Sequence, residues 1–119
     1  NLGIVAQERR QWFQANTYYK QALQIFIDSN ERLEQAPTLG RLGLLAEVQE
    51  LWEMALDYYV QAAAIFTEFD DRLSFDLTLR ALTRVQETTP SLPVAARLAK
   101  VLGSSETETS KLLDEIEQK

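Results

Sequence analysis

Apolar residues recur every three or four positions along most of the chain, which is the spacing of one buried face of an α-helix. Two long stripes of this kind lie within residues 15–27 and about 52–68. Their members are Ala15, Tyr18, Tyr19, Ala22, Leu23, Ile25 and Phe26 in the first, and Ala55, Leu56, Tyr59, Ala62, Ala63 and Phe66 in the second. No segment alternates apolar and polar residues as a half-buried strand would. The pattern predicts an all-α protein.

The pattern of residues 2–33 returns forty residues later in residues 42–73. Identical residues fall in register without a gap, as in Gly3 with Gly43, Trp12 with Trp52 and Arg32 with Arg72. A fixed period of this length is typical of a solenoid, in which each unit buries its apolar face against a neighbouring unit. Such a stack leaves a long exposed surface, which commonly binds a partner.

Turn and breaker residues suggest where the helices end. Residues 28–30 and 68–71 supply turn and N-cap chemistry before a second and a third helix. Pro37 lies inside a helix expected over about residues 31–49, and proline there predicts a kink or a restarted helix. Gly43 fits a close crossing by another helix, whereas Gly40 has no counterpart in the first unit and indicates a surface feature.

The last part of the chain looks like a degraded third unit followed by a cap. Pro93 is placed to begin a short helix that ends before Gly103, and residues 105–108 (Ser-Glu-Thr-Glu) form a capping box that opens a last helix. We expect a repeat array over residues 1–103, consisting of a truncated unit 1–33, a full unit 34–73 and a degenerate unit 74–103, and a C-terminal capping helix over 104–119. The missing front half of the first unit suggests a piece of a longer array.

The repeated residues resemble the tetratricopeptide repeat. Its pattern places a Leu-Gly pair in the first helix, an aromatic residue after the turn, and alanine, aromatic and alanine residues on the second helix. The matching residues are Leu2, Gly3, Trp12, Ala15, Tyr19 and Ala22, and then Leu42, Gly43, Trp52, Ala55, Tyr59 and Ala62. The resemblance implies a right-handed α-solenoid of antiparallel helix pairs. The repeated sequence is also similar to those of long arrays in bacterial, notably cyanobacterial, multidomain proteins.

The period departs from the usual 34 residues of that family. Forty residues also suits HEAT and armadillo repeats, whose first helix often carries a proline, as Pro37 would be. The spacing of alanine and aromatic residues favours the tetratricopeptide repeat over these alternatives.

Composition argues against several classes of function. The net charge is −6 and the basic residues are scattered, so the chain lacks the basic patch that nucleic-acid binding requires. No stretch is apolar enough to span a membrane, and the absence of cysteine fits a cytoplasmic protein. With neither histidine nor cysteine, the common catalytic triads and metal motifs are excluded. We expect no enzyme activity, no catalytic residue, no cofactor and no metal.

A partner is expected on the concave face, which the first helix of each unit lines in the family. By resemblance, the outward positions there include Gln7, Arg41, Leu44, Glu47, Arg80, Arg84 and Glu87. Some family members grip a peptide carboxylate with lysines and asparagines, but the matching positions here are Ile4, Arg41, Leu77 and Ala81, so that clamp is absent. The three arginines either form a cationic strip for an acidic peptide or pair with neighbouring glutamates as exposed salt bridges.

The sequence therefore predicts a protein–protein interaction module that captures a protein or peptide segment within a larger protein. One alternative is a repeat domain that senses a peptide or ligand and controls an attached ATPase or DNA-binding domain. Another is a structural role, with self-association through the truncated first unit.

Overall fold

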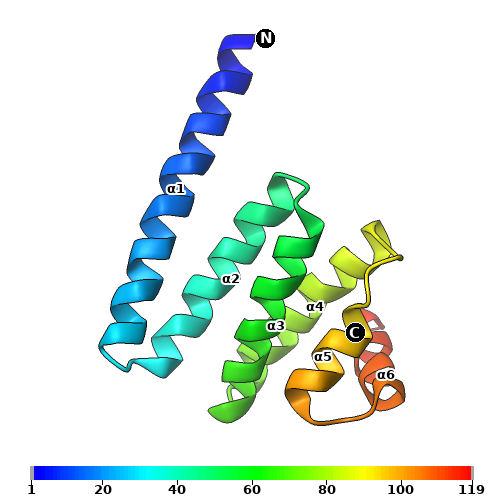
Figure 1. The fold of residues 1–119 in the computed structure, drawn as a ribbon. Coiled ribbons are helices and arrows are strands. Elements are labelled where there is room, and N and C mark those ends of the chain that lie inside the picture. Colours follow the sequence, from blue (N-terminus) through cyan, green and yellow to red (C-terminus); the bar gives the residue numbers. More distant parts are fainter. Residues whose placement is uncertain (1, 119) are drawn as a thin grey trace.

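The computed structural model describes the backbone of residues 2–118 and the side chains of residues 8–118. Within this part of the chain every regular element is a helix (Figure 1). The helices are α1 (Leu2–Asp28), α2 (Arg32–Val48), α3 (Trp52–Glu68), α4 (Arg72–Thr88), α5 (Val94–Leu102) and α6 (Glu106–Glu117). The prediction of an all-α protein is confirmed.

Successive helices pack on one another, and alternate helices also stack. The helix α2 packs on α1 and α3, and α4 packs on α3, while α5 contacts α3 and α6 contacts α4. Two rows result, one containing α4 and α6 and the other containing α3 and α5 (Figure 1). This arrangement is that of a helical-repeat solenoid, as the period predicted.

The core is centred on α3, whose apolar stripe is buried from Ala55 to Phe66. Two leucines of the repeat pattern, Leu42 on α2 and Leu82 on α4, are fully buried at equivalent positions. In contrast, the stripe of α1 is only half-buried, and the prediction that it is one buried face is wrong for Tyr18 and Ile25, which are mostly exposed. The reason is that α1 packs against α2 alone, whereas α3 is covered by α2, α4 and α5.

The predicted caps are mostly present. The Asp71 side chain accepts a hydrogen bond from the Ser74 N–H at the start of α4, and Ser105 accepts one from the Glu108 N–H at the start of α6. Gly103 ends α5 with φ 69°, the left-handed conformation that glycine adopts readily.

At the start of α2 the predicted capping by residues 28–30 is wrong. The N-cap residue is Glu31, and its side chain makes no capping hydrogen bond. Asn30 instead occupies the turn with φ 58°, a conformation that asparagine tolerates better than most residues.

The predicted restart at Pro37 is also wrong, because α2 runs through this residue without a break. Pro37 lies near the start of α2 and is exposed, as is Leu33, whose carbonyl loses its helical partner to the missing N–H. Water therefore reaches the region in which that hydrogen bond is lost.

The first unit differs most from its prediction. The resemblance implied a turn between Gly3 and Trp12, but α1 continues unbroken from Leu2 to Asp28. Residues 8–11 (Glu-Arg-Arg-Gln) are good helix formers and contain no turn residue. A separate helix over residues 2–8 would make only two turns, too few to be stable alone, so extension of α1 is favoured.

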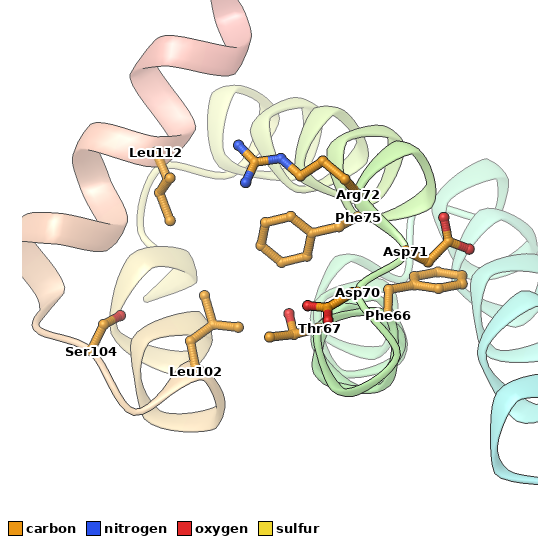
Figure 2. A pocket seen from close by; sticks show the side chains of 9 residues that line it. All are labelled: Phe66, Thr67, Asp70, Asp71, Arg72, Phe75, Leu102, Ser104 and Leu112. Atoms are coloured by element: carbon orange, nitrogen blue, oxygen red, sulfur yellow. The ribbon is translucent and has the colours of Figure 1, made fainter.

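The short α5 leaves space at one end of the array. A pocket of about 300 Å³ opens between the α3–α4 turn and the end of α5 (Figure 2).

Candidate functional site

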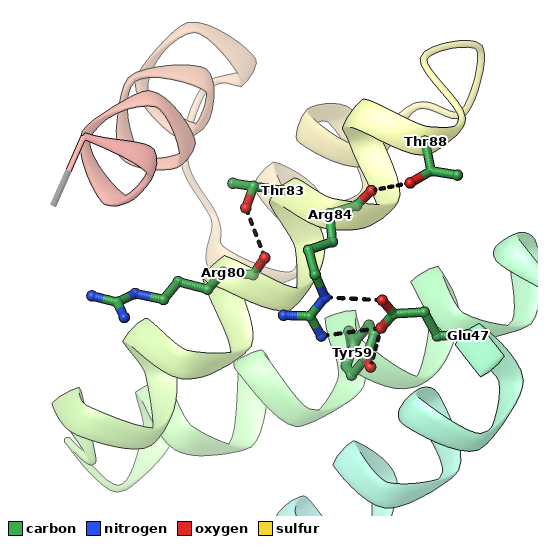
Figure 3. Close-up of polar contacts among 6 residues, drawn as sticks. All are labelled: Glu47, Tyr59, Arg80, Thr83, Arg84 and Thr88. Carbon is green, nitrogen blue, oxygen red and sulfur yellow. Dashed lines mark hydrogen bonds and ion pairs between the residues drawn. The ribbon is translucent and has the colours of Figure 1, made fainter.

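An ion pair joins α2 to α4 at the centre of the predicted binding face. Arg84 Nε donates to Glu47 Oε2 at 2.9 Å, and Arg84 Nη2 donates to Glu47 Oε1 at 3.1 Å. The hydroxyl of Tyr59, on α3, donates to the same Oε1 at 2.7 Å (Figure 3). Glu47 thus ties three helices together through a bidentate arginine and a tyrosine.

Burial and hydrogen bonding shift the acidities of this cluster. Burial raises the pKa of Glu47, but the hydrogen bonds from Arg84 and Tyr59 outweigh it, so the pKa lies below its ordinary value. Burial, together with donation to Glu47, raises the pKa of the Tyr59 hydroxyl. The hydrogen bond between Arg84 and Glu47 likewise raises the pKa of Arg84. At neutral pH, Glu47 and Arg84 are both charged and Tyr59 is protonated.

The remaining predicted residues are less closely connected. Arg41 and Leu44 are exposed on α2, and Arg80 is exposed on α4, with its side chain directed away from the Glu47–Arg84 pair (Figure 3). Within residues 8–118, neither Arg41 nor Arg80 has an ionic partner. The side chain of Gln7 lies outside the described residues. The predicted strip of three arginines therefore contains two that are available to a ligand and one, Arg84, that is bound to Glu47.

Glu87 lies at the far end of α4, close to α6. Its carboxylate raises the pKa of Glu117, because it accepts a hydrogen bond from the protonated form of Glu117 and its negative charge disfavours the ionised form. This end of the face is acidic and less suited to an acidic partner than the end that contains Arg80.

Large apolar side chains accompany these arginines. Leu44 and Val48 on α2 and Leu73 and Leu77 on α4 are each about half exposed or more. We define the α2–α4 face by Arg41, Leu44, Leu77, Arg80 and the Glu47–Arg84 pair. It offers apolar contact area beside Arg41 and Arg80, which are unpaired among residues 8–118, on helices that the Glu47 cluster fixes.

Comparison with known proteins gives one match, in which the sequence profile of the tetratricopeptide repeat family covers residues 1–68. The chain belongs to the tetratricopeptide repeat family. No curated protein and no solved structure matches it significantly. The profile covers α1–α3, whereas α4–α6, which supply Arg80 and Arg84, lie beyond it.

Membership of the tetratricopeptide repeat family agrees with a packing role for the aromatic residues. Tyr59 is buried and Trp52 and Tyr58 pack against the core, whereas Tyr18 is mostly exposed. Among residues 8–118, no group of histidine, cysteine, aspartate and glutamate side chains could hold a metal ion. No helix in the described part of this repeat protein has the length and apolarity needed to cross a membrane.

Sequence reasoning missed the part that Tyr59 plays in this cluster, because it treated that residue only as a packing element. A signal was present, since a buried tyrosine usually has a hydrogen-bond partner. A second signal lies in the repeat register: forty residues before Glu47 and Arg84 stand Gln7 and Leu44. One unit earlier, the pair of oppositely charged residues is thus replaced by two uncharged residues, so the two charges are gained together, as an ion pair between adjacent units would require.

The Glu47 cluster predicts a pH-dependent contribution to stability. Because the pKa of Glu47 is lowered in the folded state, the contribution is complete above its ordinary value of 4.5 and is lost as pH falls through the lowered pKa. We expect Glu47→Gln to reduce the free energy of unfolding by about 1 kcal/mol at pH 7, since Arg84 is half exposed. Urea denaturation of both proteins at a series of pH values from 7 downward measures this difference, which should shrink as the pH falls below 4.5. A difference that stays constant or grows as the pH is lowered would contradict the assignment.

Proposed function

We propose that this tetratricopeptide repeat protein captures a segment of a partner protein on the α2–α4 face, as part of a larger assembly. Tetratricopeptide repeats generally mediate protein–protein interaction. The observation that carries the proposal is the combination of exposed Leu44 and Leu77 with Arg41 and Arg80, which have no ionic partner among residues 8–118. Such a surface suits a segment with apolar side chains and one or two carboxylates.

In this proposal one group of residues fixes the helices in place and another group contacts the partner. The Glu47–Arg84 pair and the Tyr59 hydroxyl hold α2, α3 and α4 in fixed relative positions. Side chains on a fixed scaffold lose less conformational entropy on binding, which favours affinity. Leu44 and Leu77 would supply apolar burial, and Arg41 and Arg80 would set the position of the partner's carboxylates.

The test uses peptides selected by display against this protein, with affinities measured by calorimetry. The double variant Leu77→Ser, Arg80→Glu should bind the selected peptides at least about ten-fold more weakly, because it removes apolar area and reverses a charge. The matched control is Met54→Ser, Lys100→Glu, which makes the same kinds of change at exposed positions on α3 and α5. Equal affinity of both double variants, or a loss in the control alone, would reject the α2–α4 face as the binding site.

Further expectations from the sequence belong to the same proposal. We place the protein in the cytoplasm, as a scaffold without enzyme activity or cofactor. Self-association through α1, where Phe13, Tyr18 and Ile25 are exposed, stays a prediction that light scattering can test. Control of an attached effector domain also stays a prediction.

A further inference from the structure

An ion pair between Arg32 and Glu68 joins α2 to α3, and among the described residues no equivalent ion pair joins α4 to α5. Arg32 at the start of α2 reaches the end of α3, where its Nε and Nη2 donate to Glu68 Oε2 and Oε1 at 3.1 and 2.9 Å. This hydrogen-bonded pair raises the pKa of Arg32 and lowers that of Glu68. The first helix of a unit therefore grips a carboxylate at the end of the second helix.

The equivalent arginine has no such partner in the described part of the chain. Arg72 stands forty residues after Arg32, at the start of α4, but α5 ends at Leu102 and the residue in register with Glu68, Glu108, lies in α6. Within residues 8–118 the only ionic partner of Arg72 is Asp76, on its own helix, with Nε 3.3 Å from Asp76 Oδ1. That contact is not well enough aligned to be a hydrogen bond, since the buried Oδ1 has no hydrogen-bond partner. The two terminal nitrogens of Arg72 remain available as donors, and its side chain is 71% exposed.

A pocket occupies the place of the missing helical turns. It holds about 300 Å³, at the lower end of the range for small-molecule sites. Leu102 and Leu112 lie on one side and Phe75 on the other, and the guanidinium group of Arg72 lies beside the Phe75 ring (Figure 2). The walls are thus apolar, with one cation at an end of the pocket.

Two carboxylates also line the pocket, and their positions decide which ligands it accepts. Asp71 is engaged as the N-cap of α4, where it accepts from the Ser74 N–H. Asp70 lies away from Arg72, beside Thr67 (Figure 2). An anion would be repelled near Asp70 but attracted near Arg72. An apolar stem between the two ends would keep a carboxylate away from Asp70.

We propose that this pocket binds a carboxylate carried on an apolar stem of side-chain size. The carboxylate accepts hydrogen bonds from the terminal nitrogens of Arg72, in the role that Glu68 has for Arg32, and the stem packs between Phe75, Leu102 and Leu112. The same chemistry is offered by a small aryl or alkyl carboxylic acid and by the C-terminal residue of a peptide. The pocket is separate from the α2–α4 face, so either site can fail without the other.

The experiment titrates the isotopically labelled chain with 3-phenylpropionate and follows amide chemical shifts. We expect shifts at residues 102–112 and 66–75, and weaker binding of 3-phenylpropionamide, which has the same stem without the charge. Arg72→Gln should weaken binding of the acid about ten-fold and leave that of the amide unchanged. Arg32→Gln is the matched control and should change neither, because that arginine is already engaged by Glu68. Asp70→Asn should tighten binding of the acid two- to three-fold, that is by about 0.5 kcal/mol.

A peptide arm identifies the source of the carboxylate. An acetylated tripeptide that ends in phenylalanine is compared with its C-terminal amide, and tighter binding than that of 3-phenylpropionate assigns the site to a protein C-terminus. Weaker binding assigns it to a small acid. The proposal is overturned if neither ligand binds at about 10 mM, if acid and amide bind equally, if Arg72→Gln has no effect, or if the shifts map to the α2–α4 face.

Discussion

Replacing Leu82 by alanine is expected to lower the free energy of unfolding by about 3 kcal/mol. Leu82 is fully buried on α4 and belongs to the central cluster of apolar side chains. Truncation removes the transfer free energy of the lost methyl groups and leaves a cavity that close packing on both sides prevents from collapsing. A loss of this size is a large fraction of the stability of a chain of 119 residues. Urea denaturation followed by circular dichroism measures it as a lower transition midpoint with an unchanged slope.

Leu77→Ala on the same helix is the matched control. Leu77 is 57% exposed, so its truncation should change the free energy of unfolding by no more than about 0.5 kcal/mol. The two variants make the same chemical change on opposite faces of α4. Similar losses for both would show that α4 does not pack on α3 through the face that contains Leu82.

Replacing Gly43 by alanine is expected to destabilise the protein by about 2 kcal/mol, although alanine is the better helix former. A Cβ atom at this position would lie 2.7 Å from Cε1 of the Tyr59 ring. The ring has little freedom to move away, because Tyr59 is buried and its hydroxyl donates to Glu47. The clash would therefore separate α2 from α3 or break that hydrogen bond. Thermal unfolding and the tyrosine resonances in NMR spectra report the two effects.

Gly40→Ala, one helical turn earlier on α2, isolates the steric contribution. A Cβ atom there meets no heavy atom within 4 Å, so the alanine should stabilise the protein by up to about 1 kcal/mol through helix propensity alone. Opposite signs for the two glycine variants are the expected result. Stabilisation by both would mean that α2 and α3 approach less closely than in the structure.

Much of the architecture follows from local residues. The glycine of the repeat pattern predicted a close helix crossing, and the structure confirms this prediction at Gly43 with the ring of Tyr59. The end of α5 at Gly103 and the start of α6 at Ser105 were also readable, because each rests on backbone chemistry within a few residues. Such features depend on neighbours in the sequence and can therefore be predicted from a single sequence.

The candidate sites depended on contacts that the sequence does not reveal directly. Arg84, and not Arg80, meets Glu47 across the α2–α4 contact. Arg84 is therefore engaged, whereas Arg80 is available to a ligand. The pocket beside Arg72 exists because α5 is shorter than α3, which leaves the arginine without the carboxylate that its counterpart holds. Distances between helices far apart in the chain decide both outcomes.

The helical stripes and the forty-residue period determined the all-α repeat architecture, because helix periodicity and burial of one face are properties of short stretches of chain. Only the tertiary structure decided where a turn forms. Residues 9–11 (Arg-Arg-Gln) continue α1, whereas residues 49–51 (Gln-Glu-Leu), equally poor in turn residues, reverse the chain with Glu50 at φ 63°. That left-handed conformation costs about 1 kcal/mol. The packing of α2 on α3 along their whole length offsets this cost, and residues 2–8 are too few to provide the same contact.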